Sequence, residues 1–285
     1  MTLIDVLDET GRERQLANQI TGMLQDTAEL MSEITAWTPP PVVRFRLLSP
    51  KAWRAESMAS LRREIRASFT RSAPSPEEEA EAHKAELTYR FSTMASWWMA
   101  SGRTMLDSAG RPQTLIAPKA LHHTGLRYAS TELYRDVLHE SVHQWQITAS
   151  HSAVAPIPTL ERDRKEPDRA LLHLVEGHAD WVVQEVADRL LVPGKPPAAQ
   201  LRRSWRYRGQ TALIQWLARR VTQRGAIEQT RGQTERIRDE GLRWVESAVE
   251  GVGVIPFSKI WEDPWCLPTT AEITNIEKWF HRVGF

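Results

Sequence analysis

The chain has 285 residues, of which 37 are basic and 36 acidic, so its formal net charge is only +1. This balance disfavours nucleic acid and a membrane surface as partners held by bulk electrostatics. The single cysteine, Cys266, excludes an internal disulfide framework. No stretch approaches the roughly 18 apolar residues of a membrane span, and the first residues lack the apolar region of a signal peptide. We therefore expect a cytoplasmic protein.

In the first part of the chain, apolar periodicity predicts helices that are separated by proline and serine. Apolar residues at helical spacing between 16 and 34 indicate an amphipathic helix, which the run Pro39-Pro40-Pro41 ends. Residues 42–48 are apolar and β-branched at their start, which favours a short strand. Residues 52–69 again have a helical pattern. Ser75 and Glu78 then form a capping box that predicts a helix over about 76–100.

The second part predicts one hairpin followed by long helices. Residues 104–106 and 114–116 flank a glycine-containing loop, as in a β-hairpin. A helix is predicted from about 130 to 148 and a longer one from about 167 to 191. The remainder is mostly helical, so we expect a mainly α protein with a small β-sheet, an α+β fold.

We expect two parts that pack closely together. Residues 1–100 would form a helical N-terminal part, packed on a catalytic core of residues 101–285.

The predicted helix over 130–148 carries a His-Glu-x-x-His motif, formed by His139, Glu140 and His143. Residues four apart lie on the same face of a helix, so both imidazoles can bind one metal ion. Glu140 lies about 100° around the helix from His139, where it can approach a metal-bound water without being a ligand. A bare motif of this kind also arises by chance, on a solvated helix with two unrelated histidines.

The next predicted helix carries Glu176 and Asp180, again four residues apart. Catalytic zinc usually has three protein ligands and one open position, so Glu176 would complete a set of two histidines and one glutamate. Asp180 would accept the free N–H of a ligating histidine and fix its tautomer. Gly177 is unfavourable in a helix interior by about 1 kcal/mol relative to alanine, which indicates close approach of another helix. The alternative is a solvated acidic face, but the surrounding apolar residues favour a buried helix.

Other side chains near the two motifs are candidates for further roles. His173 and His178 compete for the third ligand position, although His178 faces a different side of its helix. We regard His178 and Tyr134 as candidate pocket donors. The metzincin pattern requires a glycine and a third histidine where this chain has Gln146 and Ala149, so that class is excluded.

The segments His-Glu-Ser-Val-His at 139–143 and Leu-Val-Glu-Gly-His-Ala-Asp-Trp-Val at 174–182 resemble the zincin-like metallopeptidase type 2 family. Its members are mainly actinobacterial, and some are associated with coenzyme F420 biosynthesis. The resemblance extends over roughly residues 100–281 and implies a glutamate-zincin fold, in which the HExxH helix faces an ExxxD helix, with bound zinc. Members often carry a tyrosine shortly before the glycine matching Gly241. This chain departs from that pattern with Arg236-Ile237-Arg238.

These features predict a zinc-dependent hydrolase, most simply a peptidase that cleaves a peptide or small amide with Zn²⁺ as cofactor and Glu140 as general base. The alternative is a zincin-fold protein that binds metal as a scaffold and has weak or no activity. A DNA-associated regulator is a third hypothesis, based on arginines between 202 and 220, but the net charge near zero favours solvated helix faces there. The sequence does not define the oligomeric state.

Overall fold

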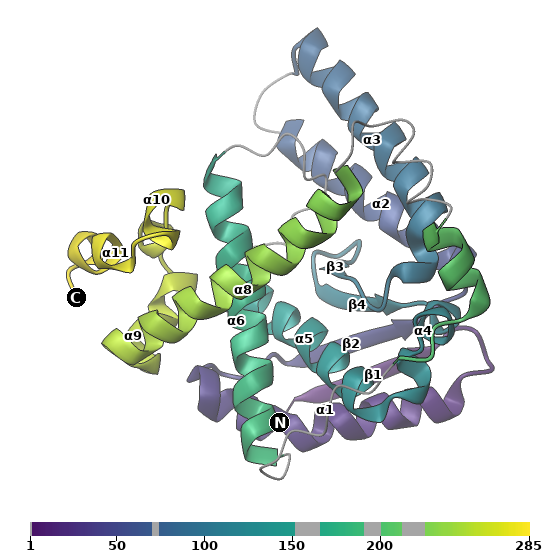
Figure 1. Ribbon diagram of the computed structural model, residues 1–285, viewed down its shortest axis with the longest axis horizontal. Helices are drawn as coiled ribbons and strands as arrows, with labels where there is room; N and C mark the ends of the chain where they lie inside the picture. The colour runs from purple at the N-terminus through teal and green to yellow at the C-terminus, as the bar shows by residue number, and fades with distance from the viewer. Residues whose placement is uncertain (1, 70–73, 152–165, 191–200, 213–225) are drawn as a thin grey trace.

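The computed structural model describes residues 2–69, 74–151, 166–190, 201–212 and 226–285. Helices predominate, and the described strands form one sheet in the order β1-β2-β4-β3 (Figure 1). This architecture confirms the predicted fold class, mainly α with a small sheet. None of the described helices combines the length and apolarity needed to span a membrane.

The strands are β1 (Leu3–Asp8), β2 (Val42–Leu47), β3 (Thr104–Leu106) and β4 (Pro112–Ile116). The helices are α1 (Arg14–Thr35), α2 (Pro50–Phe69), α3 (Pro76–Ser96), α4 (Pro118–Thr124), α5 (Ser130–Ala149), α6 (Glu166–Leu190), α8 (Ala226–Val252), α9 (Val254–Ser258), α10 (Thr270–Ile273) and α11 (Ile276–Val283). Residues 205–212 are also helical.

Strand β2 lies inside the sheet and confirms the strand predicted at 42–48. Val43, Phe45 and Leu47 alternate along it and are buried, as expected for a strand with one face on the core. Arg44 points the other way and pairs with Asp5, its neighbour on β1, at 2.8 Å. Strand β1 was not predicted. It pairs in parallel with β2 after the crossover through α1, and that pairing is not encoded in its own six residues.

Strands β3 and β4 form the predicted hairpin, in which Thr104 lies opposite Thr114. Strand β3 is at the edge of the described sheet, and β4 also pairs in parallel with β2. Strands from both sides of residue 100 therefore share one sheet. The division into parts 1–100 and 101–285 stays a prediction.

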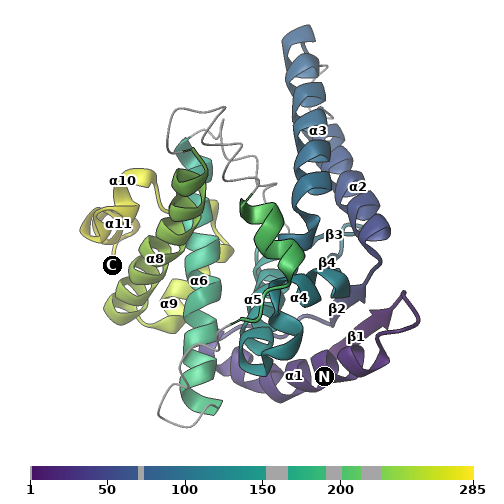
Figure 2. The ribbon, with the colours of Figure 1, turned by 45° about the vertical axis from the view of Figure 1, so that its right-hand side comes forward.

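Helix α5 packs between the sheet and α6 (Figure 2). Its apolar side is almost completely buried and consists of Leu133, Val137, Leu138, Val142 and Trp145. This side joins the main hydrophobic core, together with residues of α1, β2, α6 and α8. The polar side of α5 is thereby fixed toward α6 on one flank and the β-hairpin on the other.

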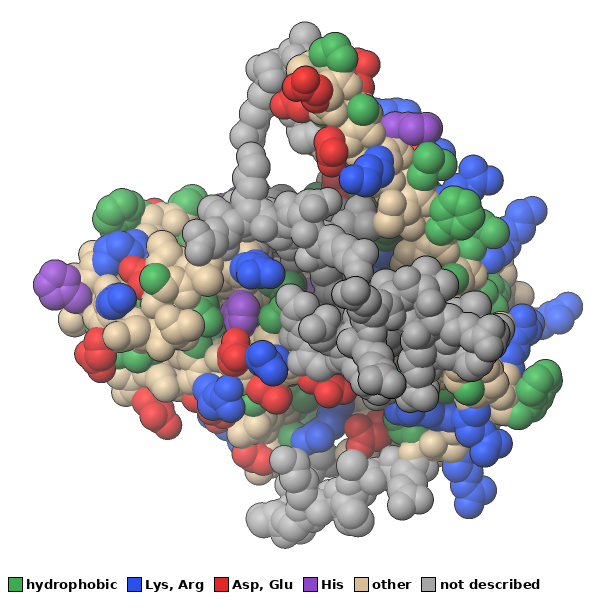
Figure 3. Space-filling view, turned by 45° about the horizontal axis from the view of Figure 1, so that its top comes forward, with side chains coloured by type: hydrophobic (Ala, Val, Ile, Leu, Met, Phe, Trp, Pro, Cys, Tyr) green, Lys and Arg blue, Asp and Glu red, His purple; other side chains and the backbone are tan. Residues whose placement is uncertain are grey.

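Helices α2 and α3 form a hairpin that projects from the body (Figures 1 and 2). The predicted capping box begins α3: the Glu78 amide donates to Ser75 Oγ at 3.2 Å, and the Ser75 amide donates to Glu78 Oε2 at 2.8 Å. Farther along, Leu87, Phe91 and Met94 are exposed at helical spacing. Apolar side chains are accordingly visible along this hairpin in the space-filling view (Figure 3).

Helices α6 and α8 cross with their backbones in direct contact, which confirms the expectation for Gly177. A Cβ at Gly177 would lie 2.1 Å from the Gly241 carbonyl carbon, and a Cβ at Gly241 would lie 2.1 Å from the His173 carbonyl oxygen. Such distances exclude any side chain at either position. The crossing brings residues one turn from each glycine close together, and those residues belong to the site described next.

Candidate metal centre

Helix α5 presents His139 and His143 on one face, one turn apart. Their rings are 4.7 Å apart between centroids, and the two Nε2 atoms are 3.1 Å apart. Both side chains are mostly buried, at 12% and 11% exposure. Two ring nitrogens this close must share either a proton or a cation, since two lone pairs would repel each other.

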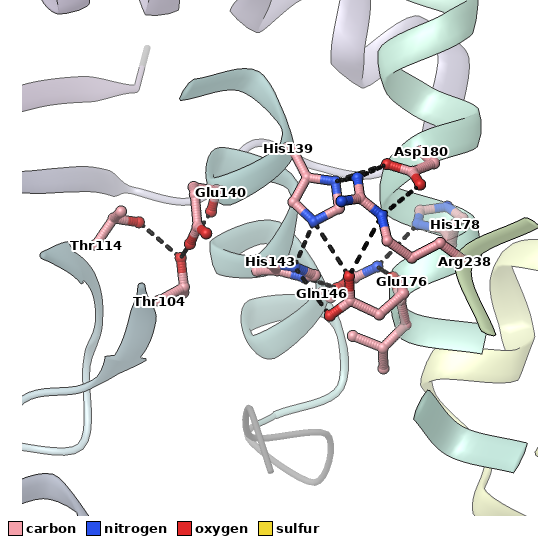
Figure 4. A network of polar contacts seen from close by, with 11 residues as sticks. Thr104, Thr114, His139, Glu140, His143, Gln146, Glu176, His178, Asp180 and Arg238 are labelled. Atoms are coloured by element: carbon pink, nitrogen blue, oxygen red, sulfur yellow. Dashed lines mark hydrogen bonds and ion pairs between the residues drawn. The ribbon is translucent and has the colours of Figure 1, made fainter. Parts of the chain in front are cut away.

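Glu176 on α6 completes the cluster (Figure 4). Its Oε2 is 3.4 Å from His139 Nε2, and its Oε1 is 3.9 Å from His143 Nε2. One ligand atom from each of the three residues lies within 4.8 Å of the others. Zinc ligands at about 2.0–2.2 Å in a tetrahedron are about 3.3–3.6 Å apart, so these donor atoms fit zinc closely. The structure thus brings together the three residues predicted as ligands.

Asp180 lies one turn farther along α6, beside His139. Its Oδ1 is 2.9 Å from His139 Nδ1, which is the contact that its predicted role requires. A carboxylate only accepts, so Nδ1 carries a proton and Nε2 is the nitrogen that faces the candidate metal position. The Nδ1 of His143 is likewise occupied, by Gln146 Oε1 at 2.8 Å. Both imidazoles therefore turn Nε2 toward Glu176.

Arg238 on α8 is a member of this cluster that the sequence analysis did not identify. Its Nε donates to Asp180 Oδ2 at 2.8 Å, its Nη2 donates to Asp180 Oδ1, and its Nε is 4.0 Å from Glu176 Oε2. The contact spans 58 residues, so no local pattern reveals it. One indirect signal was present in the sequence. Arg238 lies one turn before Gly241, and a glycine within a helix indicates close approach of another helix.

The buried charges of the centre perturb one another strongly. Burial alone would lower the pKa of His139, but hydrogen bonds to Asp180 and Glu176 raise it to about 10. Burial would raise the pKa of Glu176, but His139, His143 and Arg238 lower it to about 2. The pKa of Asp180 is also lowered, by His139 and Arg238 against the effect of burial. A field that holds a proton this firmly on an imidazole also favours a metal cation at the same place.

Glu140 lies outside the cluster of ligand atoms, on the flank of α5 that faces the β-hairpin (Figure 4). Thr104 Oγ1 is 2.6 Å from Glu140 Oε2 and 2.7 Å from Thr114 Oγ1. Gly102 packs against the same side chain, since a Cβ there would lie 2.7 Å from Glu140 Cγ. These contacts position Glu140 as a neighbour of the centre and not as a ligand. The hairpin itself was predicted, but the contact of Thr104 with Glu140 spans 36 residues and leaves no local pattern in the sequence.

Asp136 is a further, partly buried acid beside the centre. Burial and the neighbouring charge of Glu140 raise its pKa to about 6, against a hydrogen bond from Ser101. It lies one turn before His139 on the same side of α5.

The two candidate pocket donors do not reach the ligand atoms. His178 is 1% exposed, and its ring lies 5.0 Å from those of Trp37 and Trp261. Burial, followed by the charge of His143, lowers its pKa to about 3. Tyr134 lies about 140° around α5 from His139, where burial and Asp26 of α1 raise its pKa to about 12.

A histidine pair on one helix that faces a glutamate on a second, beside a small mixed sheet, is the arrangement of a zincin. Comparison with protein families supports this class, because the zincin-like metallopeptidase model matches residues 132–280. The chain belongs to the zincin-like metallopeptidase family. The matched region contains all three candidate ligands, as well as Glu140 and Asp180.

A solved structure is similar over most of the chain. The crystal structure of a candidate hydrolase with a novel fold, from Chloroflexus aurantiacus, aligns with a TM-score of 0.57 and 19% sequence identity. The alignment covers 94% of this chain and 89% of the other. At this identity the likeness establishes a common fold alone. The search of curated proteins finds no match.

Proposed function

We propose that this protein is a zinc-dependent hydrolase that cleaves a peptide or small amide, with His139, His143 and Glu176 as ligands and Glu140 as general base. The observation that carries the proposal is the convergence of three donor atoms within 4.8 Å, in a family of zincin-like metallopeptidases. Zinc in this position supplies Lewis acidity, which lowers the pKa of a water molecule toward about 7 and polarises a carbonyl group.

Glu140 moves the proton in this mechanism. It accepts a proton from the attacking water and delivers it to the leaving amine nitrogen as the C–N bond breaks. Its carboxylate is held beside the centre by Thr104, whose hydroxyl lies 2.6 Å from Oε2. A hydrogen bond to one carboxylate oxygen leaves the lone pairs of the other for the proton that is transferred.

The β-hairpin provides a surface for an extended substrate. Strand β3 pairs with β4 along one side only in the described sheet, and it begins at Thr104, which contacts Glu140. An extended peptide can add to such an edge through main-chain hydrogen bonds. In this arrangement the scissile bond would lie between the hairpin and the two imidazoles.

Arg238 balances the charge of the centre. Its guanidinium is paired with Asp180 and lies near Glu176, so two partly buried carboxylates share one cation. This pairing holds Asp180 ionised and oriented toward His139. The metal site therefore has a preformed second layer of hydrogen bonds.

Replacement of the base tests the proposal. The Glu140→Gln variant should retain one zinc per chain and lose activity against a peptide library by about 10²-fold or more, because general-base catalysis is worth roughly that factor. Glu132→Gln, on the first turn of the same helix, is the matched control and should retain activity. Unchanged activity in Glu140→Gln would remove Glu140 from the mechanism.

A metal-binding scaffold without turnover is the competing function. The observation that favours it is the contact of Glu140 with Thr104 and Gly102, which directs the carboxylate toward the hairpin. If wild type binds zinc and is stabilised by it, yet cleaves no member of the peptide library, the scaffold function is supported and the hydrolase is not.

A further inference from the structure

Gln146, which lies on α5 one turn after His143, is only 1% exposed although it is not a metal ligand. Its side-chain amide makes three contacts (Figure 4). Oε1 is 2.8 Å from His143 Nδ1, while Nε2 is 2.8 Å from the Val175 carbonyl oxygen and 3.2 Å from His178 Nδ1. One buried amide thus connects the helix that carries both histidines to the helix that carries Glu176.

The contact with Val175 determines which way this amide points. A backbone carbonyl can only accept a hydrogen bond, so the NH₂ group of Gln146 must face Val175 and its Oε1 must face His143. Oε1 also only accepts, so the proton of His143 must be on Nδ1. The lone pair of His143 is then on Nε2, the atom that lies 3.1 Å from His139 Nε2. A backbone carbonyl one residue before Glu176 therefore dictates the tautomer of a candidate ligand on the other helix.

His178 provides the second acceptor for the same NH₂ group. Its ring is buried, and ring centroids of Trp37, Trp261 and Trp181 lie 5.0, 5.0 and 5.7 Å away. A side chain packed this closely has little rotational freedom, so its Nδ1 is a fixed target for the amide. Both N–H bonds of Gln146 are thereby used, which leaves no alternative orientation with all partners satisfied.

We propose that Gln146 is a positioning residue of the metal centre, which fixes the tautomer of His143 and holds α5 in register with α6. The inference rests on the proposed function only in taking the metal to be zinc. The two candidate histidine ligands then differ in the group that accepts the hydrogen bond from Nδ1. For His139 it is the charged carboxylate of Asp180, and for His143 it is the neutral amide of Gln146. Loss of such outer contacts typically weakens metal affinity by about 10–100-fold.

The test compares two glutamines of the same helix. Gln146→Met keeps the length and approximate volume of the side chain and removes its hydrogen bonds. The matched control is Gln144→Met: Gln144 is 0% exposed, and its amide bonds to the Arg44 backbone and to Thr114. Zinc affinity is measured on the folded full-length chain by competition with a chromophoric chelator. Gln146→Met should bind zinc about 10–100-fold more weakly than wild type, and Gln144→Met within about threefold of it.

The tautomer of His143 provides a readout that a general loss of stability would not change. In metal-free wild type, ¹⁵N NMR shifts of His143 should show the Nδ1–H form, and Gln146→Met should show a mixture with the Nε2–H form. Equal zinc affinities in the two methionine variants, or an unchanged tautomer in Gln146→Met, would overturn the proposal. If wild type binds no zinc, the proposed function fails, and the NMR comparison still decides the role of Gln146.

Discussion

At the scale of single residues, the centre is governed by His139. Burial lowers the pKa of this imidazole, but the hydrogen bonds to Asp180 and Glu176 outweigh burial and raise it to about 10. Without a metal, the His139 ring is therefore protonated on both nitrogens, and so is positively charged, at pH 7. Only the neutral imidazole is a metal ligand, so zinc has to displace that proton.

The affinity for zinc should consequently depend on pH. Below the raised pKa each unit increase in pH makes removal of the proton ten times easier, so the apparent affinity should rise about tenfold per unit between pH 7 and about 9. Glu176 contributes no opposing change there, because its pKa is lowered to about 2 and it stays ionised. Competition titrations at several pH values measure the slope. An affinity that is flat over this range would show that His139 is already neutral.

Whether a residue of the centre could be predicted depends on how far it lies in the sequence from the residue that it contacts. His139, His143, Glu176 and Asp180 could be predicted because helical spacing alone places each pair on one face. Arg238 and Thr104 could not, since Arg238 meets Asp180 across 58 residues and Thr104 meets Glu140 across 36. Polar contacts of that range depend on how the elements pack, which spacing within one element does not define.

At the scale of the elements, the crossing of α6 and α8 positions the second layer of the site. The backbones of Gly177 and Gly241 are in contact. Asp180 and Arg238 each lie one turn from this crossing and bind each other. The need for a glycine at 177 was predictable from its position within a buried helix. Its partner was not, because any of several helices could have filled that place.

Gly177→Ala should therefore destabilise the protein. The added Cβ would lie 2.1 Å from the Gly241 backbone, and overpacking of this kind costs about 1–3 kcal/mol or more, above the roughly 1 kcal/mol that alanine gains in a helix. Gly22→Ala in α1 is the matched control, because nothing lies within 4 Å of its Cβ position, and it should stabilise by about 0.5–1 kcal/mol. Chemical denaturation measures both variants. Equal and favourable effects would contradict the close crossing.

Local signals predicted most of the longer elements, and pairing over distance explains why strand β1 was missed. The capping box at Ser75 and the alternation along β2 are written in neighbouring residues. Strand β1 is half exposed, and it is a strand because it pairs with β2 from Leu3↔Val42 to Asp8↔Leu47. Parallel pairing of this kind requires a crossover, here α1, so the strand cannot be recognised from its own sequence.

At the scale of the whole molecule, the site combines residues inside the family match with residues that precede it. The family match over 132–280 covers the candidate ligands, Glu140, Asp180 and Arg238, but not the hairpin that holds Glu140. The structural neighbour aligns with 94% of the chain, so the common fold extends well beyond the family match. Thr104, which precedes the family match, contacts Glu140, so residues outside the match contribute to the surroundings of the centre.

Anomalous diffraction at the zinc absorption edge, on crystals grown with zinc, would show whether His139, His143 and Glu176 bind zinc. We expect one peak about 2.0–2.2 Å from His139 Nε2, His143 Nε2 and a Glu176 carboxylate oxygen. Glu176→Gln crystals grown in the same way should show a weaker peak or none. The absence of a peak at these three residues in wild type, or zinc bound elsewhere, would contradict their role as metal ligands.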